Sequence, residues 1–212
     1  NTKESNSCSE DDSLALVAIY NKMNGENWTN QDNWLTDAPV KDWWGITVTN
    51  NRVKEIDFYI DVNSSQNVSG AFPEEFWQLT ALRAFDLRSN NIEDSISSKI
   101  KNLTNLNDIR LSHNQIKGSL PEEIGGLSNL TDIILHDNQL EGSIPVELGN
   151  LSNLTELSLS NNQLTDSVPA ELGNLTNLYS LMLGANQLTG SIPVVLGNLT
   201  NLRFLSLEVN QL

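Results

Sequence analysis

The sequence predicts an elongated solenoid in which each coil contains one short strand. Leucines recur every 24 residues from Leu82 to Leu202, and asparagines recur with the same period from Asn90 to Asn210. Regular spacing of this kind indicates stacked structural units that share a core. A third observation, an apolar segment followed by several tryptophans near the N-terminus, predicts a cap over the first coil.

Residues 1–52 are expected to form this cap. Asp11, Asp12 and Ser13 offer the side-chain oxygens that typically begin a helix. The apolar face of that helix is expected at Leu14, Leu16, Val17 and Ile19. Four tryptophans follow, for which we favour packing in the core of the cap over a sugar-stacking platform: Trp28, Trp34, Trp43 and Trp44.

Residues 53–212 are expected to form the repeats. A divergent first unit spans residues 53–81 and carries an insertion around residues 62–66. Five full units follow over residues 82–201, and residues 202–212 begin a unit that stops halfway. Because solenoids need capped ends to stay soluble, we expect further repeats or a partner to cover the C-terminal edge after Leu212.

The unit that begins at Leu130 shows why the coils must stack. The spacing of Leu130, Ile133 and Leu135 ends in the apolar–polar alternation of a strand with one buried face. Asn138 has an amide that can satisfy backbone groups where the chain bends inward, and Gly142 permits a turn. The apolar side chains of one isolated unit bury too little surface to offset the entropy lost when the unit is ordered, so neighbouring units must share a core.

The repeated pattern LxxLxLxxNxLxGxIPxxLGNLxN resembles the plant-type class of leucine-rich repeat, and residues 15–53 resemble the N-terminal cap of such proteins. The resemblance implies a right-handed α/β superhelix with a parallel sheet on the concave face, irregular or 3-10 segments on the convex face, and a helical cap. Plant members usually carry a cysteine pair in the cap, whereas Cys8 is the only cysteine here. The chain is therefore most similar to disulfide-free surface members from bacteria or algae.

With the first leucine of each unit, such as Leu130, counted as position 1, positions 2, 3, 5, 7 and 8 are expected to point outward from the sheet. This is the surface where solenoids usually bind partners. These positions place charged side chains on the early strands and apolar ones on the late strands. Arginine, methionine and aromatic residues are favoured at protein interfaces. The expected partner-binding residues are Arg88, Asp108, Arg110, His113, Asp132, His136, Asp137, Tyr179, Met182 and Phe204.

His113 and His136 are expected on adjacent strands near Asp137, and these are ligand types of a Zn²⁺ site. A flat sheet rarely closes a tetrahedral cage, so we expect ordinary surface histidines, no metal and no cofactor.

Ser112, His113 and Asp108 include the residue types of a hydrolytic triad. No nucleophile elbow and no phosphate-binding glycine loop occur, so we expect no enzyme.

Rows of hydroxyl and amide side chains are expected on the convex side, and some plant repeat proteins of this class bind ice. One such row is Ser95, Ser119, Ser143, Ser167 and Ser191.

Together, the outward residues of the sheet and the resemblance predict a non-catalytic recognition or adhesion module that binds a protein or polysaccharide through its concave sheet. The alternative is an ice- or crystalline-polysaccharide-binding protein that acts through the convex Ser, Thr and Asn rows.

Charge and hydropathy exclude two classes of partner. The 27 acidic residues outnumber the 12 basic ones and give a net charge of −15, which repels nucleic acid. The longest apolar run, residues 14–20, is far shorter than the ~20 residues that span a bilayer, so no membrane insertion is expected. The resemblance implies an extracellular or cell-surface location.

Overall fold

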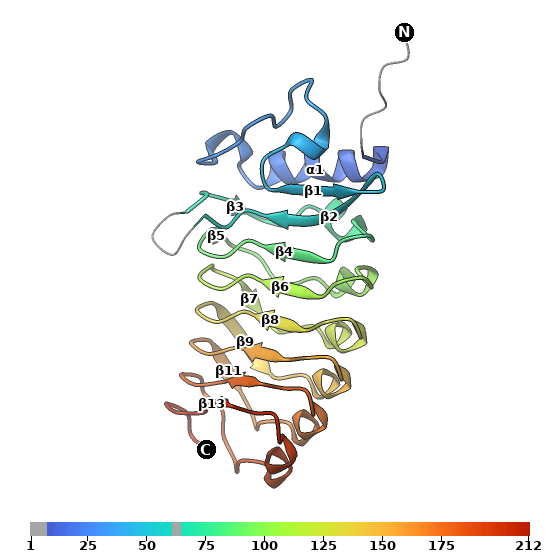
Figure 1. The fold of residues 1–212 in the computed structure, drawn as a ribbon. Helices are drawn as coiled ribbons and strands as arrows, with labels where there is room; N and C mark the ends of the chain where they lie inside the picture. The colour runs from blue at the N-terminus through green and yellow to red at the C-terminus, as the bar shows by residue number, and fades with distance from the viewer. Residues whose placement is uncertain (1–7, 61–64) are drawn as a thin grey trace.

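The computed structural model describes residues 8–60 and 65–212 and shows a stack of coils (Figure 1). One eight-stranded sheet runs along the stack in the order β1-β2-β4-β6-β8-β10-β12-β13. β1 (Ile46–Thr49) and β2 (Arg52–Asp57) pair antiparallel, and every later neighbour pairs parallel. The later strands are β4 (Ala84–Asp86), β6 (Asp108–Arg110), β8 (Asp132–Ile134), β10 (Glu156–Ser158), β12 (Ser180–Met182) and β13 (Phe204–Ser206). The predicted solenoid with its concave parallel sheet is confirmed.

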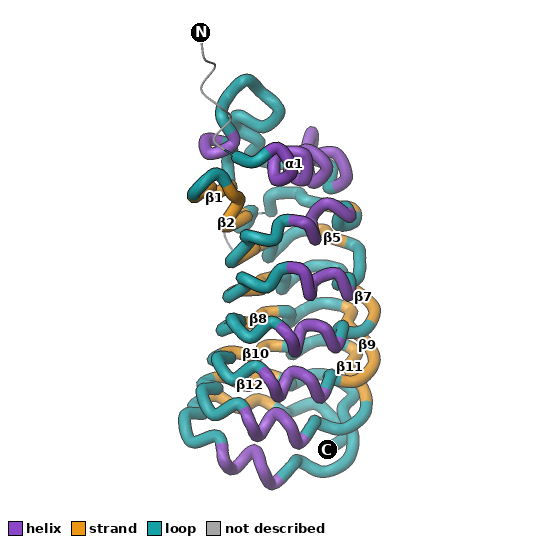
Figure 2. Tube along the Cα trace, turned by 90° about the vertical axis from the view of Figure 1, so that its right-hand side faces the viewer, coloured by secondary structure: helices purple, strands orange, loops and turns teal. Residues whose placement is uncertain are grey.

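Short 3-10 helices stack on another face of the coils, as expected (Figure 2). They are η3 (Glu74–Gln78), η4 (Ser98–Asn102), η5 (Glu122–Gly126), η6 (Val146–Asn150), η7 (Ala170–Asn174) and η8 (Val194–Asn198). Two small parallel sheets lie between these helices and the main sheet, and they were not predicted. Their strands are β3 (Ser69–Gly70), β5 (Asn91–Ile92), β7 (Lys117–Gly118), β9 (Gln139–Ser143) and β11 (Gln163–Thr165). Strands this short leave no readable alternation in the sequence.

A continuous leucine-rich core runs through the stack. Leu130, Ile133 and Leu135 are at most 1% exposed, as the unit pattern predicts. The expected role of Asn138 is also confirmed. Its Oδ1 accepts a hydrogen bond from the Ile116 N–H at 2.9 Å, and its Nδ2 donates to the carbonyl of Leu111 at 3.0 Å. Each such asparagine therefore joins two consecutive coils.

Helix α1 (Glu10–Lys22) covers the first coil, but the predicted N-cap is wrong. Ser9 is the N-cap residue, and its side chain accepts a hydrogen bond from the Asp12 N–H at 3.3 Å. Asp12 lies within the helix and is fully buried, because it binds Arg52 instead. Leu14, expected on the apolar face, is 58% exposed. The buried face is formed by Asp12, Ala15, Leu16 and Ile19.

The tryptophans of the cap form an aromatic core around Phe58. Trp28, Trp34 and Trp43 are buried, and Trp44 is half-buried and stacks on Phe58. The indole N–H groups of Trp28, Trp34 and Trp43 each donate to a backbone carbonyl, at 2.7, 2.9 and 3.1 Å. Their buried, internally satisfied rings therefore act in packing. Two short 3-10 turns, η1 (Gly25–Asn27) and η2 (Val40–Asp42), connect them.

The expected insertion around residues 62–66 falls mostly on residues 61–64, which lie outside the described residues. Cys8 is buried, and no other cysteine is present.

Among the described helices, none combines the length and the apolar character that a bilayer crossing requires.

Candidate functional site

The two arginines predicted to bind a partner are both held by carboxylates two residues earlier. Arg88 Nη2 lies 2.5 Å from Asp86 Oδ2, and Arg110 Nη2 lies 2.9 Å from Asp108 Oδ1. The Arg88 guanidinium also sits over the Tyr59 ring, 4.2 Å from its centroid. The hydrogen bonds that the Arg88 guanidinium donates to Asp86 raise the pKa of Arg88. These cations are thus largely balanced by their own neighbours.

Carboxylates form a row across three adjacent strands, which we call the acidic ladder: Asp108, Asp132 and Glu156. The strand register pairs Asp108 with Asp132 and Asp132 with Glu156. Burial, followed by the charge of Asp108, raises the pKa of Asp132. Burial, followed by the charge of Asp132, raises the pKa of Glu156. The ladder is therefore a strip of partly desolvated negative charge, and a nearby positive charge would favour its ionised form.

The predicted histidines and their acidic neighbour come together. Asp137 Oδ2 lies 2.6 Å from His136 Nδ1 and 3.5 Å from His113 Nδ1. The two imidazole rings are perpendicular, with centroids 4.9 Å apart. This cluster lies beyond the ends of β6 and β8, on the concave side.

The predicted apolar residues form an exposed pair of rings beside a methionine. Tyr179 and Phe204 are 50% and 54% exposed, and their ring centroids are 5.3 Å apart in an edge-on arrangement. Met182 in β12 is half-buried. Exposed aromatic side chains of this kind are the usual anchors of protein interfaces.

A hollow of about 350 Å³ joins the charged and apolar groups, and we call it the concave hollow. Its lining includes His136 of the histidine cluster and Glu156 of the acidic ladder. It also includes the apolar side chains of Met182 and Phe204. The remaining lining residues are small or polar: Ser158, Ser160, Asn161 and Ser180. The Ser160 hydroxyl is buried and has no hydrogen-bond partner among the described residues. The hollow therefore presents a carboxylate, an imidazole and two apolar walls to a ligand.

Sequence reasoning missed Glu156 and the three serines as site residues. It treated every outward position as equally accessible, yet Ser158 and Ser180 are 5% and 7% exposed. Ser112, which completes the residue types of a triad, is only 1% exposed and so does not face a substrate. Larger neighbours on adjacent strands stand above these small side chains. The signal that was available is a run of serines at outward positions between larger residues.

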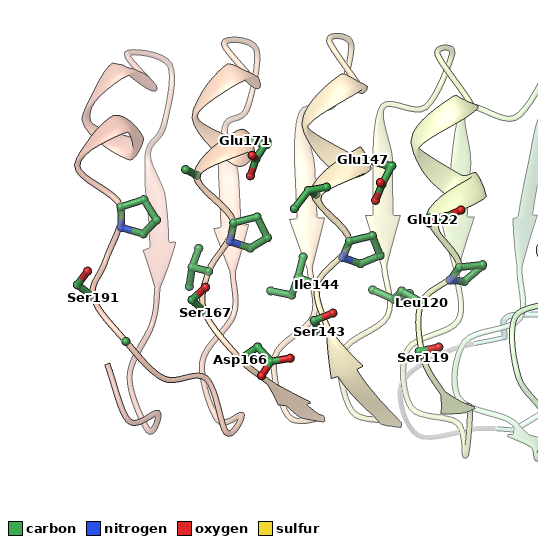
Figure 3. Close-up of a pocket in the computed structure, with 18 residues that line it drawn as sticks. Ser119, Leu120, Glu122, Ser143, Ile144, Glu147, Asp166, Ser167, Glu171 and Ser191 are labelled. Atoms are coloured by element: carbon green, nitrogen blue, oxygen red, sulfur yellow. The ribbon is translucent and has the colours of Figure 1, made fainter.

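A larger furrow of about 970 Å³ runs across four coils on the convex side (Figure 3). Its rows of equivalent residues are Ser119, Ser143, Ser167 and Ser191, and Pro121, Pro145, Pro169 and Pro193. Each proline is the N-cap residue of a 3-10 helix, so the row has a structural cause. The concave hollow, in contrast, is lined by residues that differ from coil to coil.

The chain belongs to the leucine-rich-repeat family. The family profile described as a leucine-rich repeat region matches residues 61–212. A search of curated protein sequences finds no match.

Solved structures of plant proteins share the fold. The complex of the Arabidopsis receptor kinase HAESA with the peptide hormone IDA and the co-receptor SERK1 is 29% identical, with a TM-score of 0.84 over 95% of this chain. The PEPR1–AtPEP1 complex is also 29% identical, with a TM-score of 0.85 over 95% of this chain. The chain spans only 34% and 28% of those two receptor chains. A plant ice-binding protein is 25% identical, with a TM-score of 0.73 over 96% of this chain and 72% of its own.

Proposed function

We propose that the chain is a non-catalytic, extracellular recognition module that binds an extended, basic segment of a protein or peptide across its concave sheet. The observation that carries this proposal is the concave hollow, because it sits between the acidic ladder and the exposed rings of Tyr179 and Phe204. The HAESA structure that it resembles, by title a complex with a peptide hormone and a co-receptor, supports the class of ligand and the extracellular location.

The charge balance of the sheet selects a cationic ligand. The arginines are already paired with Asp86 and Asp108, so the unpaired charge nearest the hollow is that of Glu156 and Asp132. A lysine or arginine side chain has an apolar stem and a charged head. We propose that the stem packs on Met182 and Phe204 while the head reaches Glu156.

The test starts from a displayed library of random peptides selected against the purified chain. We expect the selected peptides to be rich in lysine and arginine. Their affinity, measured by fluorescence anisotropy, should fall at least about tenfold in the Glu156→Gln, Asp132→Asn variant, because each lost charge-assisted hydrogen bond is worth ~1.5–3 kcal/mol. The matched control is Glu147→Gln, Glu171→Gln, which removes equal charge from the convex furrow.

A second pair of variants tests the hollow itself. Ser160→Leu fills it and should abolish binding, whereas Ser167→Leu on the convex side should have no effect. Selection of acidic peptides, or equal binding by the Ser160→Leu variant with an unchanged thermal midpoint, would refute the proposal. A glycan array probed with the same variants tests the polysaccharide ligand: glycan binding that Ser160→Leu abolishes would favour it over a peptide.

Ice or crystalline-polysaccharide binding is the second candidate, and the serine row of the convex furrow favours it. Ser119, Ser143, Ser167 and Ser191 are all exposed and occupy the same position in consecutive coils. An ice-recrystallisation assay tests this function. Activity that is lost in Ser143→Tyr, Ser167→Tyr and kept in Ser160→Leu would support it, and an inactive wild-type chain would reject it.

A further inference from the structure

The histidine cluster has the geometry of an incomplete metal-coordination sphere. Asp137 Oδ2 faces the Nδ1 atoms of both His113 and His136, at 3.5 and 2.6 Å. One ligand atom from each of the three residues lies within 4.8 Å of the other two. In a tetrahedral site with bonds of about 2.0–2.1 Å, neighbouring ligand atoms are about 3.3 Å apart. Small side-chain shifts therefore bring all three onto one ion.

The backbone holds the three residues in place before any ion binds. His113 and Asp137 occupy the same position of consecutive units, and both have left-handed backbones with φ of 55° and 56°. The His113 N–H donates to the His136 carbonyl at 3.1 Å, and the Asn114 N–H donates to the Asp137 carbonyl at 3.3 Å. Asn138 also donates to the His136 carbonyl, at 3.3 Å. The ligands thus stand on fixed, adjacent coils.

We propose that His113, His136 and Asp137 together bind one first-row transition-metal ion of the Zn²⁺ type. Two imidazoles and one carboxylate suit Zn²⁺, Cu²⁺ or Ni²⁺, whereas Ca²⁺ and Mg²⁺ need a shell of oxygen ligands. The side chains of His113, His136 and Asp137 are 53%, 29% and 35% exposed, so the open side is free for water or for a ligand group. Three protein ligands with one open position is the arrangement of an accessible zinc site.

This inference reverses the expectation from the sequence, which favoured ordinary surface histidines. His113 lies one coil before His136 and Asp137, so no local spacing motif marks the three ligands together. His136 also lines the concave hollow, which places the ion at the rim of that hollow. The metal proposal is independent of the proposed function, since it concerns binding of the ion alone.

The experiment uses the full chain, free of any affinity tag and stripped of metal by dialysis against a chelator. Titration calorimetry with ZnCl₂ is expected to show one site per chain, and CaCl₂ is expected to show none. His113→Asn and Asp137→Asn should each weaken Zn²⁺ binding at least about tenfold, since even outer-shell changes cost about 10–100-fold. Asparagine tolerates the left-handed backbone, so both variants keep the fold.

The matched control is Asp166→Asn, because Asp166 has the same left-handed backbone, with φ of 62°, but lies in the convex furrow. It should bind Zn²⁺ like the wild type. His136→Gln provides a third ligand variant whose backbone is not left-handed, so the test does not depend on that conformation. The visible absorption of bound Co²⁺ reports coordination independently of heat.

Two results would overturn the proposal. The first is the absence of Zn²⁺ heat and of a Co²⁺ spectrum with the wild-type chain, which would mean that Asp137 only hydrogen-bonds His136 and lies near His113. The second is Zn²⁺ binding that His113→Asn, His136→Gln and Asp137→Asn all leave unchanged, which would assign the ion to other carboxylates. Loss of peptide binding alone would bear on the proposed function and leave the metal site standing.

Discussion

The buried carboxylate of Asp12 accepts two hydrogen bonds from the guanidinium of Arg52, from Nε at 2.9 Å and from Nη2 at 3.0 Å. The same carboxylate accepts a third hydrogen bond, at 2.8 Å, from the backbone N–H of Val53. Asp12 belongs to α1, and Arg52 begins β2. This single side chain therefore fastens the cap helix to the first coil of the sheet.

Replacing that carboxylate should destabilise the cap. In Asp12→Ala the Val53 N–H and the Arg52 guanidinium lose their buried partner. We expect the free energy of unfolding to fall by about 3 kcal/mol, because hydrogen bonds to charged groups are worth ~1.5–3 kcal/mol and Arg52 keeps some access to water. Urea unfolding followed by tryptophan fluorescence measures the change. Asp11→Ala, at the exposed neighbouring residue, is the control and should cost less than about 1 kcal/mol.

The asparagine of each coil should matter more than the glutamine beside it. Asn138→Ala removes a bond to the Ile116 N–H and bonds to the carbonyls of Leu111 and Leu135. Buried backbone groups left unpaired cost ~1–3 kcal/mol each, so we expect a loss of about 3 kcal/mol in urea unfolding. Gln139→Ala, at an exposed position, should change stability by less than about 0.5 kcal/mol. Equal effects of the two variants would contradict this role.

The glycines of the 3-10 helices differ in what surrounds them. A Cβ at Gly149 would lie 2.5 Å from the backbone oxygen of Glu171 in the next coil, whereas a Cβ at Gly126 would meet nothing within 4 Å. Gly149→Ala therefore forces neighbouring coils apart and should cost about 1–3 kcal/mol. Gly126→Ala should be neutral or slightly stabilising. Thermal unfolding of the two variants side by side decides the matter, and a stable Gly149→Ala chain would show that the coils separate freely.

Mild acid should stabilise the folded chain, because protonation removes the partly buried negative charges of Asp132 and Glu156. Burial raises the pKa values of Asp132 and Glu156, so the folded chain binds protons at these groups more tightly than the unfolded chain. Their contribution to stability therefore rises as the pH falls from neutral toward the ordinary values of 3.8 and 4.5. The Asp132→Asn, Glu156→Gln variant should be more stable than the wild type near neutral pH.

The same variant should also show a smaller change of thermal midpoint between about pH 7 and about pH 5, because its two raised groups no longer titrate. Calorimetric scans across this range measure the difference. The Glu147→Gln, Glu171→Gln variant supplies the comparison on the convex side. An identical pH dependence of the thermal midpoint in both variants would contradict the raised pKa values of Asp132 and Glu156.

Much of this protein could be predicted from the repeat alone. Residues equivalent to Leu130, Ile133 and Asn138 recur in the units from Leu82 onward, and each interior coil has similar coils on both sides. A residue's position in the repeat therefore fixes most of its three-dimensional surroundings, which is why the strands of the main sheet and the inward-facing residues follow from the period.

The cap shows where that reasoning stops. Ser9 and Asp12 both have side chains that can begin a helix, and the sequence does not choose between them. The choice depends on Arg52, which lies 40 residues from Asp12 along the chain and reaches it only when the first coil folds beneath the helix. Long-range pairing of this kind has no counterpart in the repeat.

By itself, then, the sequence determined the solenoid, its register and which side chains point outward, because these depend on periodicity and burial. Only the tertiary structure decided which outward side chains meet. The depth of the hollow at Ser160 depends on how far Met182 and Phe204 rise beside it. The meeting of His113 with Asp137 depends on side-chain directions across two coils. Both are set by packing between strands, which a one-dimensional pattern does not contain.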